Sequence, residues 1–202
     1  MIPDAPVLQG RYVRLEPLQR HHADALVAAA AEDPPLYRWS IVPHGATEVA
    51  AYIDAAISSP VVAFASIRVA DNTVIGSTRF FDIEQWAWPK GHPRHGRAAP
   101  DACEIGYTWY ARSAIRTGAN TEGKLLMLTH AFEVWGMLRV CFHTDMRNER
   151  SRAALARIGG QFEGVLRSHR MASDFTARDS ARFSIVAAEW PTAKQRLAEM
   201  LR

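Results

Sequence analysis

Hydrophobic and polar positions alternate with a period of two in several short segments, which is the pattern of a half-buried β-strand. The pattern predicts strands at 11–16, 61–70, 74–82, 103–110, 139–144, 162–169 and 181–188. The second and third of these are separated only by Asp71-Asn72-Thr73, a polar turn of hairpin length, so they should pair antiparallel. The last two segments should form a final hairpin.

Apolar residues at helical spacing lie between these strands. They predict helices at 17–30, 47–57, 148–158 and 191–202, and one that follows Gly118. Thr47 is a plausible N-cap of the second helix, and Gly159-Gly160 should end the helix at 148–158. The helix after Gly118 carries Leu125, Leu128, Phe132 and Trp135 on one face. The order of elements predicts an α/β (α+β) protein with a mixed sheet flanked by helices.

Residues 83–102 interrupt the pattern with three prolines, two glycines and two tryptophans. A loop of this length without secondary structure is either functional or an ordered surface excursion. Trp86 and Trp88, with the nearby Lys90, Arg94 and Arg97, could form a wall that recognises an acceptor. Packing of the tryptophans onto the domain explains them equally well, and we favour that interpretation.

Length and composition narrow the classes of function. The 202 residues suit one domain, 1–202, and no apolar run approaches the roughly 20 residues that span a bilayer. The chain starts without the features of a secretion signal and holds only two cysteines, which favours a reducing cytoplasm. A net charge of +3 falls short of a nucleic-acid signature, so an RNA-binding module built on the basic loop is disfavoured.

The segment that carries most chemistry is 104–124, where a strand-like run breaks at a turn around Gly118 and opens a long helix. A helix start presents unpaired backbone N–H groups and about half a positive charge. The turn is therefore suited to a phosphate or pyrophosphate.

The whole order of elements resembles the GCN5-related N-acetyltransferases, the GNAT superfamily. The family writes its acyl-CoA pyrophosphate turn as Gln/Arg-x-x-Gly-x-Gly/Ala, onto which Ile115-Arg-Thr-Gly118-Ala-Asn120 can be laid. Ile115 and Asn120 depart from that pattern, while Arg116 offers its charge one place later. A branch containing ribosomal-protein N-terminal (RimJ/RimL-like) acetyltransferases is similar in five segments: Leu8-x-Gly-x-Tyr-Val-Arg-Leu-x-Pro-Leu18, Glu104-Ile-Gly-Tyr-Thr-Trp109, Asn120-Thr-Glu122, Asn148-x-x-Ser151 and Gly164-Val-Leu-Arg167.

This resemblance implies a GNAT fold, with a mostly antiparallel central sheet splayed at the cofactor site, and acetyl-CoA as the cofactor. The backbone of Thr108, Trp109 and Tyr110 would pair with the pantetheine arm, and Asn148 would touch it. The pyrophosphate would be held by the turn, for which the candidate residues are Ile115, Arg116, Thr117, Gly118, Ala119, Asn120 and Thr121. A homodimer is a further expectation from the family.

Transfer of acetyl to an amine needs removal of a proton from the amine and a proton for the departing thiolate. By resemblance, Glu104 is the candidate base, and a salt-bridged structural glutamate is the alternative. Ser151 is the candidate acid, although a serine three residues after an Asn148 N-cap could simply support the cap. Tyr110 is the second candidate acid.

Histidines and cysteines suggest no further chemistry. His92 and His95, in a Pro/Gly loop, lack the third and fourth ligands of a closed zinc site, so we expect solvated loop histidines. Neither these two nor the pair His21-His22 leads us to expect a metal. Cys103 and Cys141 should lie on neighbouring central strands as buried thiols, which disfavours an acetyl-cysteine intermediate and makes direct transfer simpler.

The sequence therefore predicts an acetyl-CoA-dependent N-acetyltransferase that acts on a primary amine. A protein N-terminus is one acceptor, and the amine of a small metabolite, antibiotic or aminoacyl nucleotide is the alternative. A non-catalytic acyl-CoA-binding domain is the rival from another class. No nucleic acid and no membrane is expected as a partner.

Overall fold

A computed structural model describes residues 6–202, and its centre is one eight-stranded sheet. The strand order is β1-β2-β3-β4-β5-β6-β8-β7. The strands are β1 (Leu8–Gln9), β2 (Val13–Pro17), β3 (Val62–Arg68), β4 (Thr73–Glu84), β5 (Ala102–Tyr110), β6 (Arg139–Asp145), β7 (Gln161–Met171) and β8 (Ala177–Val186). Every pair is antiparallel except β5 with β6. This mixed, mostly antiparallel sheet confirms the predicted fold class.

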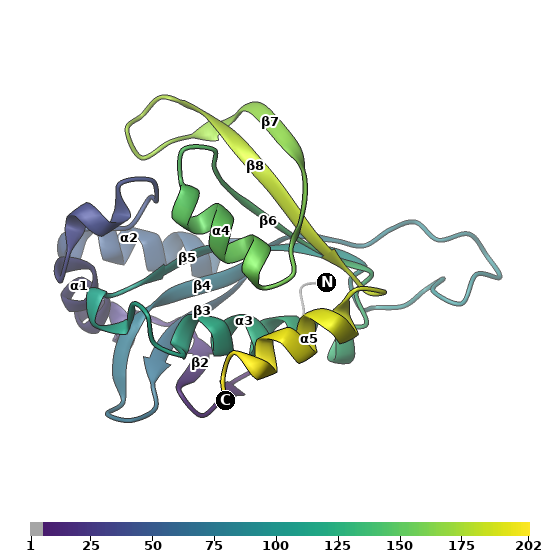
Figure 1. Cartoon of the computed structure of the whole chain (residues 1–202), viewed down its shortest axis with the longest axis horizontal. Helices are drawn as coiled ribbons and strands as arrows, with labels where there is room; N and C mark the ends of the chain where they lie inside the picture. Colours follow the sequence, from purple (N-terminus) through teal and green to yellow (C-terminus); the bar gives the residue numbers. More distant parts are fainter. Residues whose placement is uncertain (1–5) are drawn as a thin grey trace.

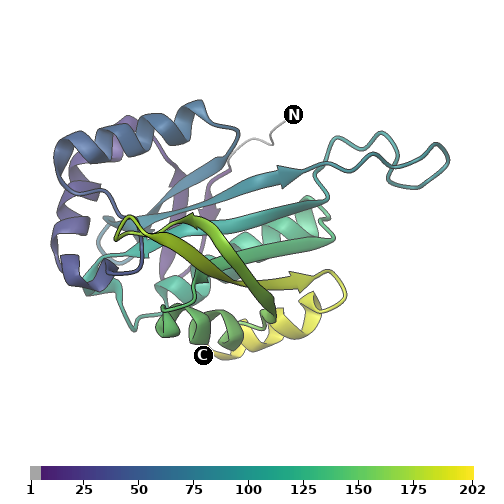
Figure 2. The ribbon, with the colours of Figure 1, turned by 90° about the horizontal axis from the view of Figure 1, so that it is seen from above.

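Helices cover the two faces of the sheet unequally (Figures 1 and 2). They are α1 (Ala23–Ala31), α2 (Gly45–Ser58), α3 (Ala119–Thr129), α4 (Glu149–Arg157) and α5 (Trp190–Glu199). One core joins α3, α4 and α5 to side chains such as Phe80, Ile105 and Phe142. A second, smaller core joins α1 and α2 to Ala65 and Trp109 on the other face. The face opposite α3 is therefore covered only in part.

The predicted helices and strands are present, but several of them begin or end at other residues than predicted. The hairpin of β3 and β4 turns at Asp71-Asn72 with Asn72 at φ 58°, and the final hairpin is longer than predicted. Thr47 does not cap α2, because the helix already begins at Gly45 after His44. The helix after Gly118 changes at His130 into a five-residue π-helical turn, His130–Val134, before Trp135.

The loop between β4 and β5 projects from the domain, as Figure 1 shows. It is anchored at its base, where Arg94 donates to Asp101 and to the carbonyl oxygen of Gly136. Trp88 stacks on His92 with ring centroids 4.1 Å apart. The tryptophans thus pack within the projecting loop, and not onto the domain as we expected.

The hairpin of β7 and β8 curls over the partly covered face of the sheet (Figure 2). Near its tip Asp174 pairs with Arg147 at 2.8 Å, and the guanidinium of Arg147 lies 4.2 Å from the ring centre of Trp39. The hydroxyl of Ser173 donates to the carbonyl oxygen of Arg38. The hairpin tip is thus tied to the segment between α1 and α2.

Candidate active site

The two central parallel strands separate after three residues. Ala102 to Glu104 pair with Arg139 to Cys141, and beyond that point no β-pairing joins β5 and β6, both of which lie wholly within the described residues. On its other side β5 stays paired with β4 as far as Tyr110. The backbone of 105–110 therefore presents an open edge toward the splay, which is what an extended, amide-containing ligand needs for strand-like pairing.

The predicted anion turn lies at the end of this open edge. Arg116 is in the left-handed region at φ 62°, and Gly118 is the N-cap of α3. Thr117 supports the turn, because its hydroxyl donates to the carbonyl oxygen of Ala114 and accepts from the N–H of Ala119. Within residues 6–202 the N–H groups of Arg116, Thr117 and Gly118 donate to no other group. The turn therefore offers donors to an anion.

The structure explains why Ile115 stands where the family's turn pattern has Gln or Arg. Its side chain is partly buried and packs against the main core, so it anchors the turn instead of facing a ligand. Arg116 is exposed and carries the positive charge at the turn. The free donors and this charge fit a pyrophosphate, although the side chain at position 115 contributes none of the binding groups.

Gly118 is required by a neighbouring ring. A Cβ atom added there would lie 2.8 Å from Cδ2 of Tyr12, which is closer than such atoms approach. The glycine itself has φ −67°, so no left-handed backbone demands it. A larger residue at 118 would therefore require the Tyr12 ring to move.

Glu122, in the first turn of α3, holds the N-terminal strands. Its carboxylate accepts from the backbone N–H groups of Arg11, Tyr12 and Val13 at 2.6–2.8 Å. Gly10 leaves room for it, since a Cβ at Gly10 would lie 2.3 Å from Oε2 of Glu122. The motif around Gly10 and the motif that ends at Glu122 are thus two halves of one contact.

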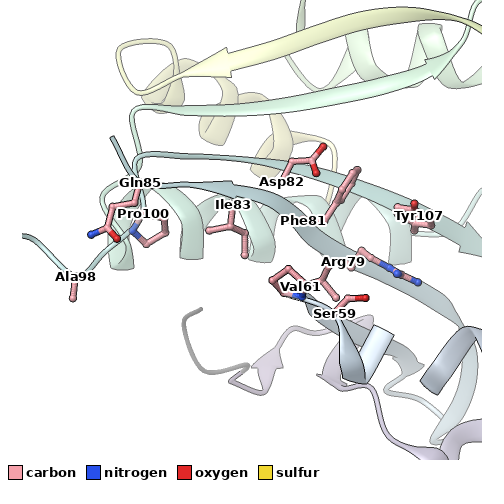
Figure 3. A pocket seen from close by; sticks show the side chains of 11 residues that line it. Ser59, Val61, Arg79, Phe81, Asp82, Ile83, Gln85, Ala98, Pro100 and Tyr107 are labelled. Carbon is pink, nitrogen blue, oxygen red and sulfur yellow. The ribbon is translucent and has the colours of Figure 1, made fainter. Parts of the chain in front are cut away.

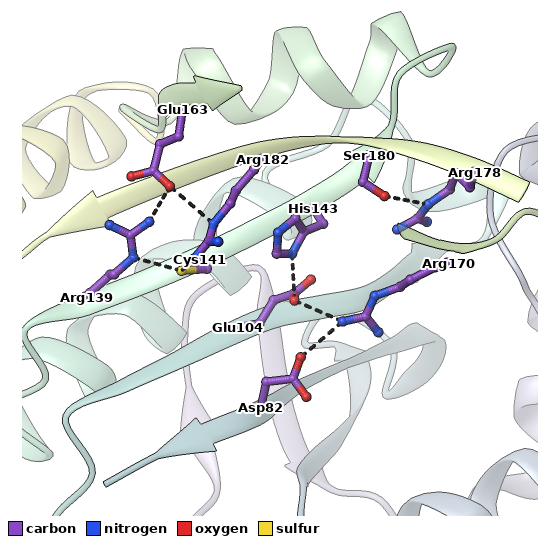
Figure 4. A network of polar contacts seen from close by, with 10 residues as sticks. All are labelled: Asp82, Glu104, Arg139, Cys141, His143, Glu163, Arg170, Arg178, Ser180 and Arg182. Carbon is purple, nitrogen blue, oxygen red and sulfur yellow. Dashed lines mark hydrogen bonds and ion pairs between the residues drawn. The ribbon is translucent and has the colours of Figure 1, made fainter. Parts of the chain in front are cut away.

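Glu104 lies at the closed end of the splay, on the sheet face opposite α3. Its side chain is 6% exposed, and Oε2 lies 2.7 Å from Nδ1 of His143 on β6. Nη2 of Arg170 on β7 lies 3.4 Å from the same oxygen. The same nitrogen lies 3.0 Å from Oδ2 of Asp82 on β4 (Figure 4). His169 lies beside His143, and burial first, then the charge of His143, lower the pKa of His169. Glu104 is thus a buried carboxylate held between an imidazole and a guanidinium.

The first turn of α4 approaches the other side of the splay. Asn148 is the N-cap of this helix, and its side-chain oxygen accepts from the N–H of Ser151 at 3.0 Å. The hydroxyl of Ser151 has no hydrogen-bond partner among the described residues. The capping role of Asn148 is therefore present, and the Ser151 hydroxyl is left for another partner.

The predicted residues of β5 divide between the two faces. Trp109 lies in the small core beneath α1 and α2, and Tyr110 lies in the main core beside Gly123. Burial raises the pKa of Tyr110 to about 12. Its hydroxyl points away from the Glu104 side of the sheet, so we do not retain Tyr110 as an acid.

A buried lysine behind Thr108 was missed by the sequence reasoning. Nζ of Lys124 donates to the hydroxyl of Thr108 at 2.8 Å, and the same hydroxyl lies 2.7 Å from that of Thr78. Burial lowers the pKa of Lys124 to about 7. Within residues 6–202 no carboxylate pairs with this lysine, so a buried amine without a counter-charge lies behind Thr108 of β5.

Of the two loop histidines expected to be solvated, His95 is exposed, whereas His92 is partly buried against Trp88. In the other pair His22 is buried, because it packs on His21 and lies 3.6 Å from Glu16. The possible metal-ligand atoms of Glu16, His21 and His22 lie within 4.8 Å of one another. Two of these groups already have hydrogen-bond partners, because Glu16 accepts from Arg14 and Nδ1 of His22 accepts from the N–H of Gln19. Cys103 and Cys141 are buried free thiols on the adjoining strands β5 and β6, and burial raises the pKa of Cys103.

A parallel strand pair that opens beside a helix-starting anion turn is a site for an extended ligand with an anionic group. A family model described as an acetyltransferase (GNAT) domain matches residues 13–161. The chain belongs to the GNAT acetyltransferase family. No helix within residues 6–202 combines the length and the apolar character needed to cross a membrane.

Solved structures agree with this assignment. A GCN5-related N-acetyltransferase from Brucella melitensis is 30% identical, with a TM-score of 0.84, 100% of this chain covered and 88% of the other. A putative acetyltransferase from T. thermophilus is 33% identical over 100% of both chains, with a TM-score of 0.82. Mycobacterium smegmatis RimJ, in complex with CoA-disulfide, shares the fold at 23% identity, a TM-score of 0.75 and coverage of 93% and 88%. No match was found among curated proteins.

Proposed function

We propose that this protein is an acetyl-CoA-dependent N-acetyltransferase that transfers the acetyl group directly to a primary amine. The observation that supports this most is a continuous path along β5. The free N–H groups of the turn at Arg116–Gly118 lie at one end of the open edge, and the buried carboxylate of Glu104 lies at the other. Pyrophosphate, pantetheine and thioester follow one another in the same order along acetyl-CoA.

In this proposal Glu104 and His143 together remove the proton from the acceptor amine. A primary amine is mostly protonated at neutral pH, so a base must act before the nitrogen can attack. The contact between Glu104 and His143 holds the imidazole in place and supports the positive charge that it gains with the proton. Sequence reasoning supplied Glu104 but not His143.

Ser151 is proposed to donate a proton or a hydrogen bond to the departing thiolate. Its hydroxyl is unpartnered within residues 6–202 and lies in the first turn of α4, where the helix dipole favours negative charge. Asn148, besides capping the helix, would contact the pantetheine arm. Acetyl-CoA itself supplies the activated acyl group. The chain's own residues bind it, orient the amine and move protons.

The acceptor is proposed to be a protein N-terminal α-amine, with a small-molecule amine as the alternative. The support for the first is the similarity of motifs to the RimJ/RimL-like branch and a shared fold with a RimJ solved with CoA-disulfide. Either amine would approach Glu104 from the partly covered sheet face, over which the β7–β8 hairpin curls.

The first test is thermal unfolding with and without acetyl-CoA. Ligand at about 100 times its dissociation constant should stabilise the fold by roughly 2.7 kcal/mol. The second is release of CoA with a panel of N-terminal peptides and small amines. Stabilisation followed by turnover supports the proposal, stabilisation without turnover on any amine favours the non-catalytic binding domain, and no stabilisation at millimolar acetyl-CoA contradicts both.

A further inference from the structure

A cavity of about 440 Å³ lies on the same face of the sheet as Glu104. It is bordered by the start of β3, by β4 and β5, and by the base of the projecting loop. Figure 3 shows Arg79 and Tyr107 at one end of it, with Gln85, Ala98 and Pro100 at the other. Its volume is in the range of small-molecule pockets, and apolar side chains such as Phe81 and Ile83 share its lining with polar ones such as Arg79.

The cavity adjoins the proposed base through Phe81. A Cβ atom added to Gly106 would lie 2.8 Å from the ring of Phe81 and 3.5 Å from Oε1 of Glu104, so the ring and the carboxylate lie over the same point of β5. Phe81 and Tyr107 both line the cavity. A molecule in the cavity could therefore extend past Phe81 and present an amine near Glu104.

Arg79 is the unusual residue of this lining. Its side chain emerges from β4 and the residue is only 7% exposed, with its guanidinium 4.6 Å from the ring centre of Tyr52 and 4.1 Å from that of Tyr107. In residues 6–202 no carboxylate pairs with it, and its Nε and Nη2 atoms have no hydrogen-bond partner. A buried charge without a partner is costly, and a guanidinium is shaped to receive a carboxylate.

The nearby acid cannot serve as that partner. Asp82 also lines the cavity, but it pairs with Arg170 at 3.0 Å. Its side chain is also 61% exposed, so it leaves the buried guanidinium of Arg79 uncompensated. The buried cation thus calls for an anion that comes with a ligand.

We propose that Arg79 recognises a carboxylate on the acceptor, so that the protein acetylates amines that also carry an acidic group. This inference rests on the proposed acetyltransferase function. Two sources share the chemistry: a peptide with Asp or Glu next to its N-terminal residue, and a small ω-amino acid. In either, Arg79 holds the carboxylate while Glu104 and His143 act on the amine.

The test compares matched acceptors with the wild-type chain. Ser-Glu and Ser-Gln peptides form one pair, and 4-aminobutyrate and its amide form the other. We expect the acid of at least one pair to be used with a KM at least about tenfold lower than its neutral partner. The pair that responds identifies the source. Equal use of acid and neutral acceptors in both pairs overturns the proposal without any variant.

Variants then assign the effect to Arg79. In Arg79→Met the KM of the acid should rise about tenfold or more while that of the neutral partner stays unchanged, and Arg79→Lys should recover part of the difference. Arg68→Met is the matched control. It removes an arginine of β3 that is paired with Asp71, and it should keep the preference for the acidic acceptor. An undiminished preference in Arg79→Met would contradict the assignment.

A separate readout keeps this inference distinct from the proposed function. Calorimetry with 4-aminobutyrate and with Ser-Glu, in the presence of CoA, measures binding without turnover. Binding of one acid that is lost in Arg79→Met, together with no acetylation, would support the pocket and contradict the enzyme. Acetylation without any acid preference would support the enzyme and contradict the pocket.

Discussion

The carboxylate of Glu104 lies 2.7 Å from Nδ1 of His143, which is two residues beyond Cys141, the partner of Glu104 in the last residue pair before β5 and β6 separate. Both side chains are at most 8% exposed, so each determines the surroundings of the other. The sequence shows a glutamate and a histidine 39 positions apart, and only the register of the parallel pair brings them together.

If the two residues act as one base, their replacements should not be additive. We expect Glu104→Gln and His143→Gln each to lower kcat about 100-fold with little change in acetyl-CoA affinity, and the double variant to be no slower than the slower single one. Steady-state CoA release and a thermal shift with acetyl-CoA measure the two properties. A double variant whose loss is the product of the single losses would show two independent roles.

Tyr12 packs on Gly118, so variants at these two positions can distinguish an effect on stability from an effect on cofactor binding. We expect Gly118→Val to lower the melting temperature, because its side chain meets the Tyr12 ring, and also to weaken acetyl-CoA binding. In a Tyr12→Ala background the stability loss caused by Gly118→Val should shrink while the loss of binding remains. Normal acetyl-CoA binding in that double variant would show that the turn does not hold the pyrophosphate.

Glu122 should contribute strongly to stability. Glu122→Gln exchanges a carboxylate that accepts three backbone N–H groups for an amide, and we expect the free energy of unfolding to fall by about 2–4 kcal/mol. Urea denaturation measures it. Glu199→Gln is the matched control, since among the described residues the exposed side chain of Glu199 is hydrogen-bonded only to Gln195, and it should change stability by less than about 0.5 kcal/mol. We call the contact of Glu122 with the three N–H groups the Glu122 clamp. Similar losses of stability in the two variants would show that the clamp does not stabilise the fold.

Lys124 predicts a pH dependence of stability. Its pKa is about 7 in the folded chain and near the ordinary 10.5 when unfolded, so between these values the unfolded chain binds more protons and stability rises with pH. Lys124→Met should remove that rise and stabilise the protein at pH 7 by an amount on the order of a few kcal/mol. Thr108 keeps its contact with Thr78. If the stability of the wild type and of Lys124→Met changed with pH in the same way, the pKa of Lys124 would not be lowered in the folded protein.

The parts of the site that the sequence could predict are those that depend on local order. The Asn148 cap, the hairpin of β3 and β4 and the helix start after Gly118 are each determined by neighbouring residues. The network around Glu104 depends on pairing between distant strands and on the curl of β7, which local patterns do not encode. Arg79 escaped notice because β4 is buried over seven consecutive residues, which leaves no alternation to mark a misplaced charge.

The clamp at Glu122 also bears on how the chain folds. Its carboxylate reaches backbone groups as many as 111 positions earlier, so the first strands emerge from the ribosome long before α3 does. Such a contact closes a long loop, and its entropy must be overcome before the contact gains anything. The contact between the N-terminal strands and α3 should therefore form late, although β2 pairs with β3 much earlier along the chain. Transient opening of these strands would then release bound cofactor as well.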